Sequence, residues 1–173
     1  IDTILKALAA AMPERIPAAH KGDMGGCSFY GYRKDTGTRF VLMNIFGGGW
    51  GGRPHEDGES ASVSICQGDV RNTPVELQEI HYPFVLECHR LRPDSGGAGK
   101  YRGGASGYIA SIFYGVQSSK RAGTGGGGAK IKRMLVGNGL FGGYPPNTHP
   151  GVSIENSNIL ELMARGEKDI PTS

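Results

Sequence analysis

One stretch of the sequence is more distinctive than any other: Arg92-Pro93-Asp94-Ser95-Gly96-Gly97-Ala98-Gly99-Lys100-Tyr101-Arg102-Gly103-Gly104. Its glycines are part of a wider excess, because 30 of the 173 residues are glycine, more than twice the usual share of about 7%. The chain has no Gly-X-Y period, which excludes collagen, and 38% of it is hydrophobic, which excludes a disordered linker. We therefore expect a folded protein whose glycines lie in loops and bends, where backbones approach each other or a ligand closely.

Charge and composition narrow the class of protein further. The chain has 19 Lys and Arg against 16 Asp and Glu, a formal net charge of +3. This excess is too small and too evenly spread to indicate a nucleic-acid or membrane partner, and no apolar run approaches the length of a membrane helix. The three cysteines, Cys27, Cys66 and Cys88, are odd in number and widely spaced. They favour a reduced, cytoplasmic location over a disulfide framework.

Hydrophobic periodicity predicts an α+β fold. Residues 2–12 follow a helical repeat that Pro13 ends, and a second short helix is expected near 159–163, capped by Asn156 or Ser157 and closed by Arg165-Gly166. Between these helices the period changes to two. The predicted strands are Ser28–Arg33, Arg39–Phe46, Ser60–Cys66, Phe84–Leu91, Tyr108–Tyr114 and Lys130–Val136. The result is a strand-rich unit with long glycine loops and short terminal helices.

Two connecting segments are predicted separately. Residues 34–37, with the sequence Lys-Asp-Thr-Gly, are typical of a hairpin turn between the first two strands. Residues 115–129 are polar and rich in glycine, so we expect a flexible loop there.

Two glycine runs, 47–52 and 137–142, match the pattern G-x-G-x-x-G. A dinucleotide site needs a helix after these glycines, because the helix N-terminus holds the pyrophosphate. Pro54 follows the first run, and Tyr144-Pro145-Pro146 follows the second, where that helix would begin. The sequence therefore argues against a Rossmann site.

His55 and Asp57 directly follow the first glycine run, at the kind of loop where functional groups collect. Two residues of these types, two positions apart, can both reach one metal or one substrate. The alternative is a turn with Asp57-Gly58 at its corner and a solvated imidazole. We consider both residues candidate catalytic groups.

A second candidate cluster consists of Asn72, Glu76 and Glu79. If a helical turn spans 75–80, the two glutamates share one face, where paired carboxylates can push each other's pKa values apart for acid and base chemistry. The structural alternative is an N-cap at Asn72 or Thr73, with Glu76 completing a capping box. Capping does not exclude a second role, with the glutamates catalytic and Asn72 binding substrate.

The distinctive stretch carries three cations, Arg92, Lys100 and Arg102, on a glycine-rich backbone that suits a carboxylate or phosphate. Arg92 and Asp94 could instead form a local pair that braces the loop.

Taken in order, the run 47–54, Asp57-Gly58, the segment 72–76, the stretch 92–104 and the run 139–143 resemble the hydantoinase B/5-oxoprolinase family. The resemblance extends over nearly the whole chain, and the stretch 92–104 is its most specific motif. It covers only the C-terminal third or so of such a subunit, and the chain opens on Ile1 rather than methionine. We therefore expect residues 1–173 to be a single C-terminal segment of a larger subunit.

The resemblance implies a cytoplasmic complex with a hydantoinase A-type subunit, which binds ATP and Mg and phosphorylates a substrate oxygen or bicarbonate. The B-type subunit then carboxylates a ketone or hydrolyses a cyclic amide such as a hydantoin, 5-oxoproline or a lactam. The resemblance also implies a divalent metal such as Zn or Mn whose ligands lie in the rest of the B-type subunit. We therefore assign no metal ligand to His20 or His55.

Trp50 departs from the family pattern, in which a smaller residue is usual at this position, and 141–144 is similar to acetone and acetophenone carboxylases. An aromatic side chain near the substrate suits an apolar ketone. We therefore expect a ketone carboxylase, with Trp50 in substrate binding. The alternatives are a cyclic amidase and a non-catalytic scaffold segment of the complex.

Overall fold

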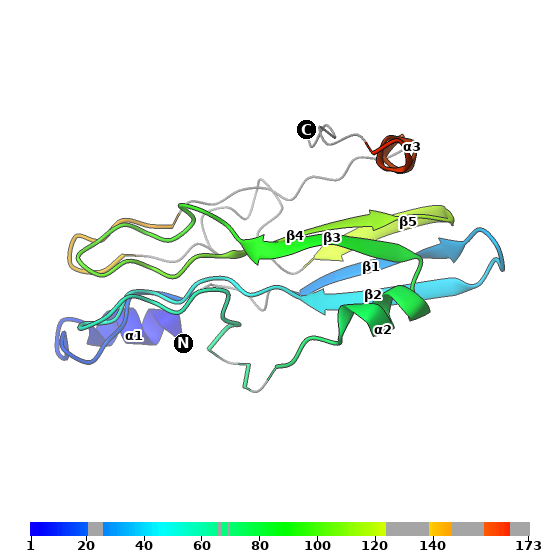
Figure 1. The fold of residues 1–173 in the computed structure, drawn as a ribbon. Helices are drawn as coiled ribbons and strands as arrows, with labels where there is room; N and C mark the ends of the chain where they lie inside the picture. Colours follow the sequence, from blue (N-terminus) through cyan, green and yellow to red (C-terminus); the bar gives the residue numbers. More distant parts are fainter. Residues whose placement is uncertain (21–25, 66, 69, 124–138, 147–157, 167–173) are drawn as a thin grey trace.

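The computed structural model describes residues 1–20, 26–65, 67–68, 70–123, 139–146 and 158–166. Its helices and strands form an α+β arrangement (Figure 1), as the sequence predicts. In chain order they are α1 (Asp2–Leu8), β1 (Gly26–Arg33), β2 (Arg39–Ile45), α2 (Val75–His81), β3 (Phe84–Leu91), β4 (Gly107–Phe113), β5 (Val116–Gly123) and α3 (Ile159–Ala164). Within the described residues, no helix is long and apolar enough to cross a membrane.

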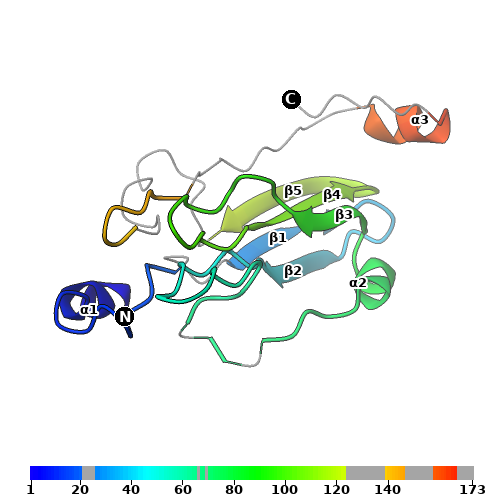
Figure 2. The same cartoon turned by 60° about the vertical axis from the view of Figure 1, so that its left-hand side comes forward.

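Two antiparallel sheets form the centre of the molecule. One sheet has the order β2-β1-β5 and the other pairs β3 with β4, and the two sheets lie against each other (Figures 1 and 2). Phe113 of β4 packs against Phe29, Phe40 and Phe84, with ring centroids 4.9, 6.3 and 5.9 Å away. Phe84 is only 1% exposed, and burying a side chain of this size contributes about 2–3 kcal/mol. This aromatic cluster joins the two sheets.

Four of the predicted strands are confirmed to within two residues as β1, β2, β3 and β4. Burial alternates most clearly in β2, where Phe40 and Leu42 are buried and Val41 and Met43 are exposed. The turn at 34–37 is also confirmed, because it links β1 and β2, and Gly37 adopts a positive φ of 66°. The strand predicted at Lys130–Val136 lies outside the described residues.

The flexible loop predicted at 115–129 is wrong over its first half. Val116–Gly123 forms β5, which pairs antiparallel with β1, while 124–129 lie outside the described residues. A polar segment can occupy a sheet edge because the pairing uses backbone groups, which every non-proline residue carries. The polar composition therefore misled the prediction.

The strand predicted at Ser60–Cys66 is also wrong. Of this range the structure describes 60–65, and these residues form an isolated bridge between Ser62 and Gly48 but no strand. Ala61 has a φ of 51°, which interrupts an extended chain. The carbonyl of Val63 accepts a hydrogen bond from the indole of Trp50 instead of from a neighbouring strand.

Both terminal helices are confirmed, although α1 is shorter than predicted. Helix α1 ends at Leu8, and turns lead from there to Pro13. Helix α3 begins after Asn158, whose side chain makes no capping hydrogen bond, while the predicted caps at 156 and 157 lie outside the described residues. The predicted closure is confirmed, because Gly166 has a φ of 71° and donates its backbone N–H to the Met163 carbonyl.

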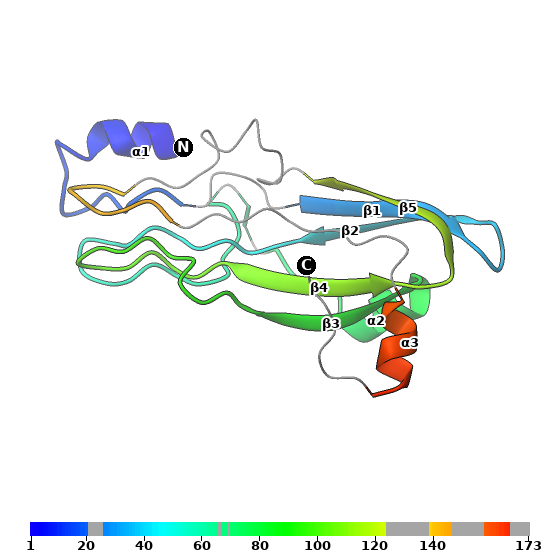
Figure 3. The same ribbon diagram turned by 90° about the horizontal axis from the view of Figure 1, so that it is seen from above.

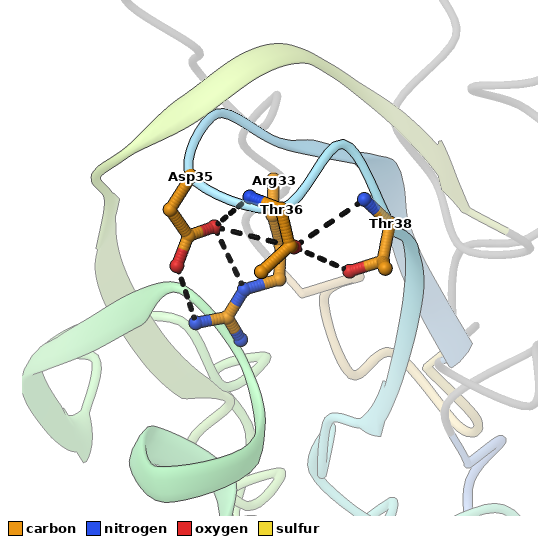
Figure 4. Close-up of polar contacts among 4 residues, drawn as sticks. All are labelled: Arg33, Asp35, Thr36 and Thr38. Atoms are coloured by element: carbon orange, nitrogen blue, oxygen red, sulfur yellow. Dashed lines mark hydrogen bonds and ion pairs between the residues drawn. The ribbon is translucent and has the colours of Figure 1, made fainter.

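A compact polar network holds the turn between β1 and β2 (Figure 4). The guanidinium of Arg33 donates two hydrogen bonds to the Asp35 carboxylate, at 3.3 and 3.4 Å. The backbone N–H of Thr36 donates a third, at 2.8 Å. The hydrogen bonds from the Arg33 side chain, with the smaller effect of the Thr36 N–H, lower the pKa of Asp35 below its ordinary value.

We predict that Arg33→Gln raises the Asp35 pKa toward its ordinary value, as measured by NMR titration of the side-chain carboxyl. Because the folded-state pKa is the lower one, the pair stabilises the hairpin above the ordinary carboxyl pKa. That contribution is lost as the pH falls through the depressed pKa. Arg39→Gln, at the start of β2, is the matched control and should leave the titration unchanged. An unchanged Asp35 pKa in Arg33→Gln would contradict the assignment.

Candidate functional site

The glycine-rich loops gather at one end of the molecule, beyond the ends of the sheets (Figures 1 and 3). We call this assembly, residues 47–52, 58–61 and 96–105, the glycine bundle. Trp50 donates its backbone N–H to the Glu59 carbonyl and accepts from Gly104, both at 2.9 Å, while Gly52 accepts from Ala18 at 2.9 Å. The segment around Trp50 therefore has three neighbouring segments, whereas a strand in a sheet has two.

Glycine is required at the contacts within the bundle. A Cβ on Gly49 would overlap the carbonyl of Gly104, one on Gly104 would overlap the carbonyl of Glu59, and one on Gly58 would overlap that of Trp50. In each case the obstructing atoms are backbone, which cannot rotate away as a side chain can. The glycine excess in the sequence is therefore explained here by close backbone contact.

Trp50, predicted to bind substrate, lies against a buried histidine. Its indole Nε1 donates to the Val63 carbonyl at 2.6 Å, and its ring meets His20 edge to face at 5.1 Å. His20 is 3% exposed, and its Nδ1 lies 3.1 Å from Oδ1 of Asp2 in α1. This chain of contacts attaches α1 to the bundle. The structure thus gives the Trp50 side chain a packing role.

Sequence reasoning gave no role to His20. Its partner Asp2 is 18 residues away and belongs to no motif shared with it. The only local signal is the small pair Ala18-Ala19, which lets Gly51 approach the chain beside His20.

Of the two candidates after the first glycine run, His55 is exposed at a bend. Asp57 is also exposed, and its Oδ1 accepts a hydrogen bond from the backbone N–H of Arg102 at 2.8 Å. Gly58 donates its own N–H to the Arg102 carbonyl at 2.8 Å. The Asp57 turn therefore clamps the distinctive stretch to the bundle, as the structural alternative for this turn suggests.

The cations of the distinctive stretch take different positions. Arg102 lies 3.7 Å from Asp94 in an exposed ion pair, so the predicted pairing of Asp94 with Arg92 is wrong. Lys100 places its ammonium 5.2 Å from the centre of the Tyr101 ring. Lys100 and Arg102 are exposed and present ammonium and guanidinium groups that suit an anion.

A buried serine closes this stretch, and sequence reasoning did not select it. Ser95 is 2% exposed; its hydroxyl donates to the Arg92 carbonyl and accepts from the Ser106 N–H, both at 2.8 Å. Arg92 donates its own N–H to the Ser106 carbonyl. Arg92 thus lies at the base of the loop, where its backbone fixes the loop's two ends together.

The predicted helical turn at 75–80 is confirmed as α2, but the capping box is wrong. Helix α2 begins after Pro74 without a side-chain cap, and the Thr73 carbonyl accepts from Gln78 instead. Glu79 is also used structurally, because its Oε1 accepts from the backbone N–H of Leu86 in β3 at 2.8 Å. Asn72 and Glu76 are exposed.

The predicted site residues therefore fall into two groups at opposite ends of the molecule (Figure 1). The glycine bundle and the turn that follows its first run hold Trp50, His55, Asp57, Lys100 and Arg102, with Arg92 at the base of the loop. Asn72, Glu76 and Glu79 lie at or next to α2. Among the described residues, no three His, Cys, Asp or Glu side chains are close enough together to hold a metal ion.

The loop 139–146 packs on the glycine bundle and presents a strained aromatic residue. Tyr144 donates its N–H to the Ala98 carbonyl at 2.9 Å, and a turn is closed by Gly143 donating to Leu140. At the centre of that turn, Phe141 and Gly142 both have positive φ, 49° and 88°. Phe141 is 70% exposed. A bulky residue in the left-handed region costs about 1–2 kcal/mol, and burial against the described residues does little to compensate that cost.

Comparison with known proteins gives a consistent family. The family profile described as Hydantoinase B/oxoprolinase matches residues 1–168. The acetophenone carboxylase delta subunit of Aromatoleum aromaticum is 33% identical over 157 residues, covering 88% of this chain and 22% of that protein. A Pseudomonas protein provisionally assigned as the B-type subunit of a D-/L-hydantoinase is 36% identical over 103 residues, or 60% of this chain and 17% of its own length.

The fold also matches a solved structure, that of nucleotide-free acetone carboxylase. The TM-score is 0.72 over 97% of this chain and 22% of that chain, at 21% identity. This chain thus spans about a fifth of the length of these proteins.

The backbone contacts of the bundle predict a large difference between two glycines. We expect Gly49→Ala to lower the free energy of unfolding by about 3 kcal/mol or more, because the new methyl group has no room beside Gly104. Gly68→Ala is the matched control, since no atom lies within 4 Å of its added Cβ. Urea denaturation of both variants tests this, and equal stabilities would show that the contact is not a constraint.

The strained turn at Phe141 predicts a substitution that increases the free energy of unfolding, in contrast to Gly49→Ala. Phe141→Asn should raise the free energy of unfolding by about 1 kcal/mol, because asparagine tolerates a positive φ better. Leu140→Asn, in the same turn, is the control and should not stabilise. Denaturant unfolding measures both, and a destabilised Phe141→Asn would mean that the aromatic side chain stabilises the fold.

Proposed function

The chain belongs to the hydantoinase B/oxoprolinase family, and from this premise we propose that it is the C-terminal part of the B-type subunit of an ATP-dependent ketone carboxylase. The choice of reaction rests on one observation, the share of this chain that aligns with each relative. The acetophenone carboxylase relative aligns over 88% of this chain, whereas the hydantoinase relative aligns over 60%. A further relative, the acetone carboxylase alpha subunit of Xanthobacter autotrophicus, is 27% identical over 68% of the chain.

The proposed reaction uses ATP because neither reactant is reactive enough alone. A hydantoinase A-type partner subunit in the cytoplasm would hold ATP and Mg and transfer a phosphoryl group to bicarbonate and to the ketone's enol oxygen. Phosphorylation gives the carboxyl carbon a good leaving group, so the enol carbon forms a bond to that carbon as its phosphate leaves. The phosphoryl group on the enol oxygen passes to water, and the ketone carbonyl forms again. A divalent metal such as Zn or Mn would be held by the rest of the B-type subunit.

The residues of this chain would contribute anion binding and proton transfer. Lys100 and Arg102 present exposed cations to a carboxylate or phosphate. Asp57 holds the backbone of Arg102 at 2.8 Å, which makes it a positioning residue. His55 is exposed beside this clamp, where an imidazole can exchange a proton with a bound substrate.

The second candidate is ATP-dependent hydrolysis of a cyclic amide. It is favoured by the 36% identity to the hydantoinase relative and by 30% identity over 108 residues to the beta subunit of the Pseudomonas jessenii caprolactamase. In that reaction phosphorylation of the amide oxygen activates the ring for attack by water, and no bicarbonate is consumed.

We predict that the complete complex incorporates label from bicarbonate into an acid-stable product when it is given ATP and an alkyl or aryl ketone. Omission of ATP or ketone should abolish incorporation. In parallel, hydantoin, 5-oxoproline and caprolactam are assayed for ring opening without bicarbonate. Ring opening without labelling across the ketone panel would replace the carboxylase with the cyclic amidase.

Variants separate a catalytic role of this segment from a scaffold role. Lys100→Ala and Arg102→Ala should lower kcat/KM at least tenfold while the complex stays assembled, since both side chains are exposed and neither supports the core. Lys34→Ala, in the hairpin turn, is the matched control. If Lys100→Ala, Arg102→Ala, Asp57→Asn and Glu76→Gln all leave turnover intact, the segment is a scaffold.

A further inference from the structure

In the sheet formed by β1, β2 and β5, strands β1 and β2 carry apolar side chains on both faces. Residues directly opposite each other in an antiparallel pair lie on the same face. Phe29 pairs with Leu42 and Gly31 with Phe40 on the face that contacts β4. The alternate pairs, Ser28 with Met43, Tyr30 with Val41 and Tyr32 with Arg39, therefore lie on the opposite face. We call Tyr30, Tyr32, Val41 and Met43, with Arg39 at their rim, the outer sheet face.

This face is exposed in the chain, although its composition is that of a buried surface. Tyr32, Val41 and Met43 are 48%, 49% and 64% exposed. An antiparallel sheet with one solvated face alternates apolar and polar residues. Strand β2 instead reads Arg-Phe-Val-Leu-Met-Asn-Ile, with apolar side chains at consecutive positions on both faces. Such a pattern is typical of a sheet covered on both sides.

The length of the relatives points the same way. The relatives are about three and a half to four times as long as this chain, since 103 aligned residues make up 17% of one and 157 make up 22% of the other. Much polypeptide is therefore present in the relatives that can cover this surface.

We propose that the outer sheet face is an intrasubunit interface, covered by the part of the B-type subunit that corresponds to the other four-fifths of the relatives. This inference rests on the family membership and on the proposed place of the chain within a larger subunit, and it holds for either candidate reaction. The covering surface is apolar, with a carboxylate opposite Arg39. A second copy of this chain fits less well, because β1 and β2 contain no Asp or Glu to meet Arg39.

The assignment is tested by site-directed cross-linking in the assembled complex. Met43 is replaced by a photoreactive benzoylphenylalanine, and the cross-linked peptide is identified by mass spectrometry. We expect a peptide from the B-type subunit outside residues 1–173. A cross-link to a second copy of residues 1–173, or to the ATP-binding partner, overturns the proposal, and so does the absence of any cross-link.

Thiol labelling provides a second measurement that does not depend on activity. In the assembled complex, Met43→Cys should react with a maleimide at least tenfold more slowly than Thr36→Cys, the matched exposed control in the hairpin turn. Denaturation should equalise the two rates. If Met43→Cys reacts as fast as Thr36→Cys before denaturation, the face is open to solvent and the proposal fails, whatever reaction the complex catalyses.

Discussion

The structure depends on one constraint above all, the direct contact of backbone with backbone where glycines have no side chain. At Gly49 and Gly104 the approach leaves no room for a methyl group. Segments that are distant in the sequence can therefore exchange hydrogen bonds as neighbours, as Trp50 does with both Glu59 and Gly104. The glycine bundle is therefore a frame of hydrogen-bonded backbone with its side chains at the edges. It holds its loops in place with little burial of apolar side chains.

Most of the polar groups near this frame serve to close it. Asp57 accepts from the Arg102 N–H, Ser95 links the two ends of the 92–104 stretch, and His20 joins Asp2 to the Trp50 ring. The bonds of Ser95 and His20 satisfy buried polar groups whose removal from water would otherwise be costly. The side chains that remain exposed, such as Lys100, are then available for ligands because the backbone beneath them is already fixed.

Elements with a local signal in the sequence were predicted correctly, whereas elements held by contacts between distant residues were not. Strands β1 to β4 were predictable because each is a short run with several apolar or aromatic residues, a signal that appears locally in the sequence. Strand β5 was missed because its sequence, Val-Gln-Ser-Ser-Lys-Arg-Ala-Gly, is mostly polar, and the backbone bonds that pair it with β1 leave no trace in composition. The glycine motifs indicated the family, because a motif is a local feature of the sequence. The contacts of Gly49 and Gly104 could not be predicted, since residues so far apart in the sequence meet only in the folded chain.

The candidate site was predictable in residue type and only partly in arrangement. The helical turn considered at 75–80 is present as α2, but the sequence could not show that Glu79 accepts a hydrogen bond from the Leu86 N–H, because β3 approaches α2 only in the folded chain. His20 carried no signal, since its partner belongs to a helix 18 residues earlier. The sequence gives the chemical type of a side chain. Whether that side chain is free to bind a ligand depends on which backbone groups lie within hydrogen-bond distance in the folded chain. The two ends of the molecule therefore differ: the glycine bundle satisfies many of its own polar groups, while β2 retains an apolar face that the described part of the chain leaves exposed.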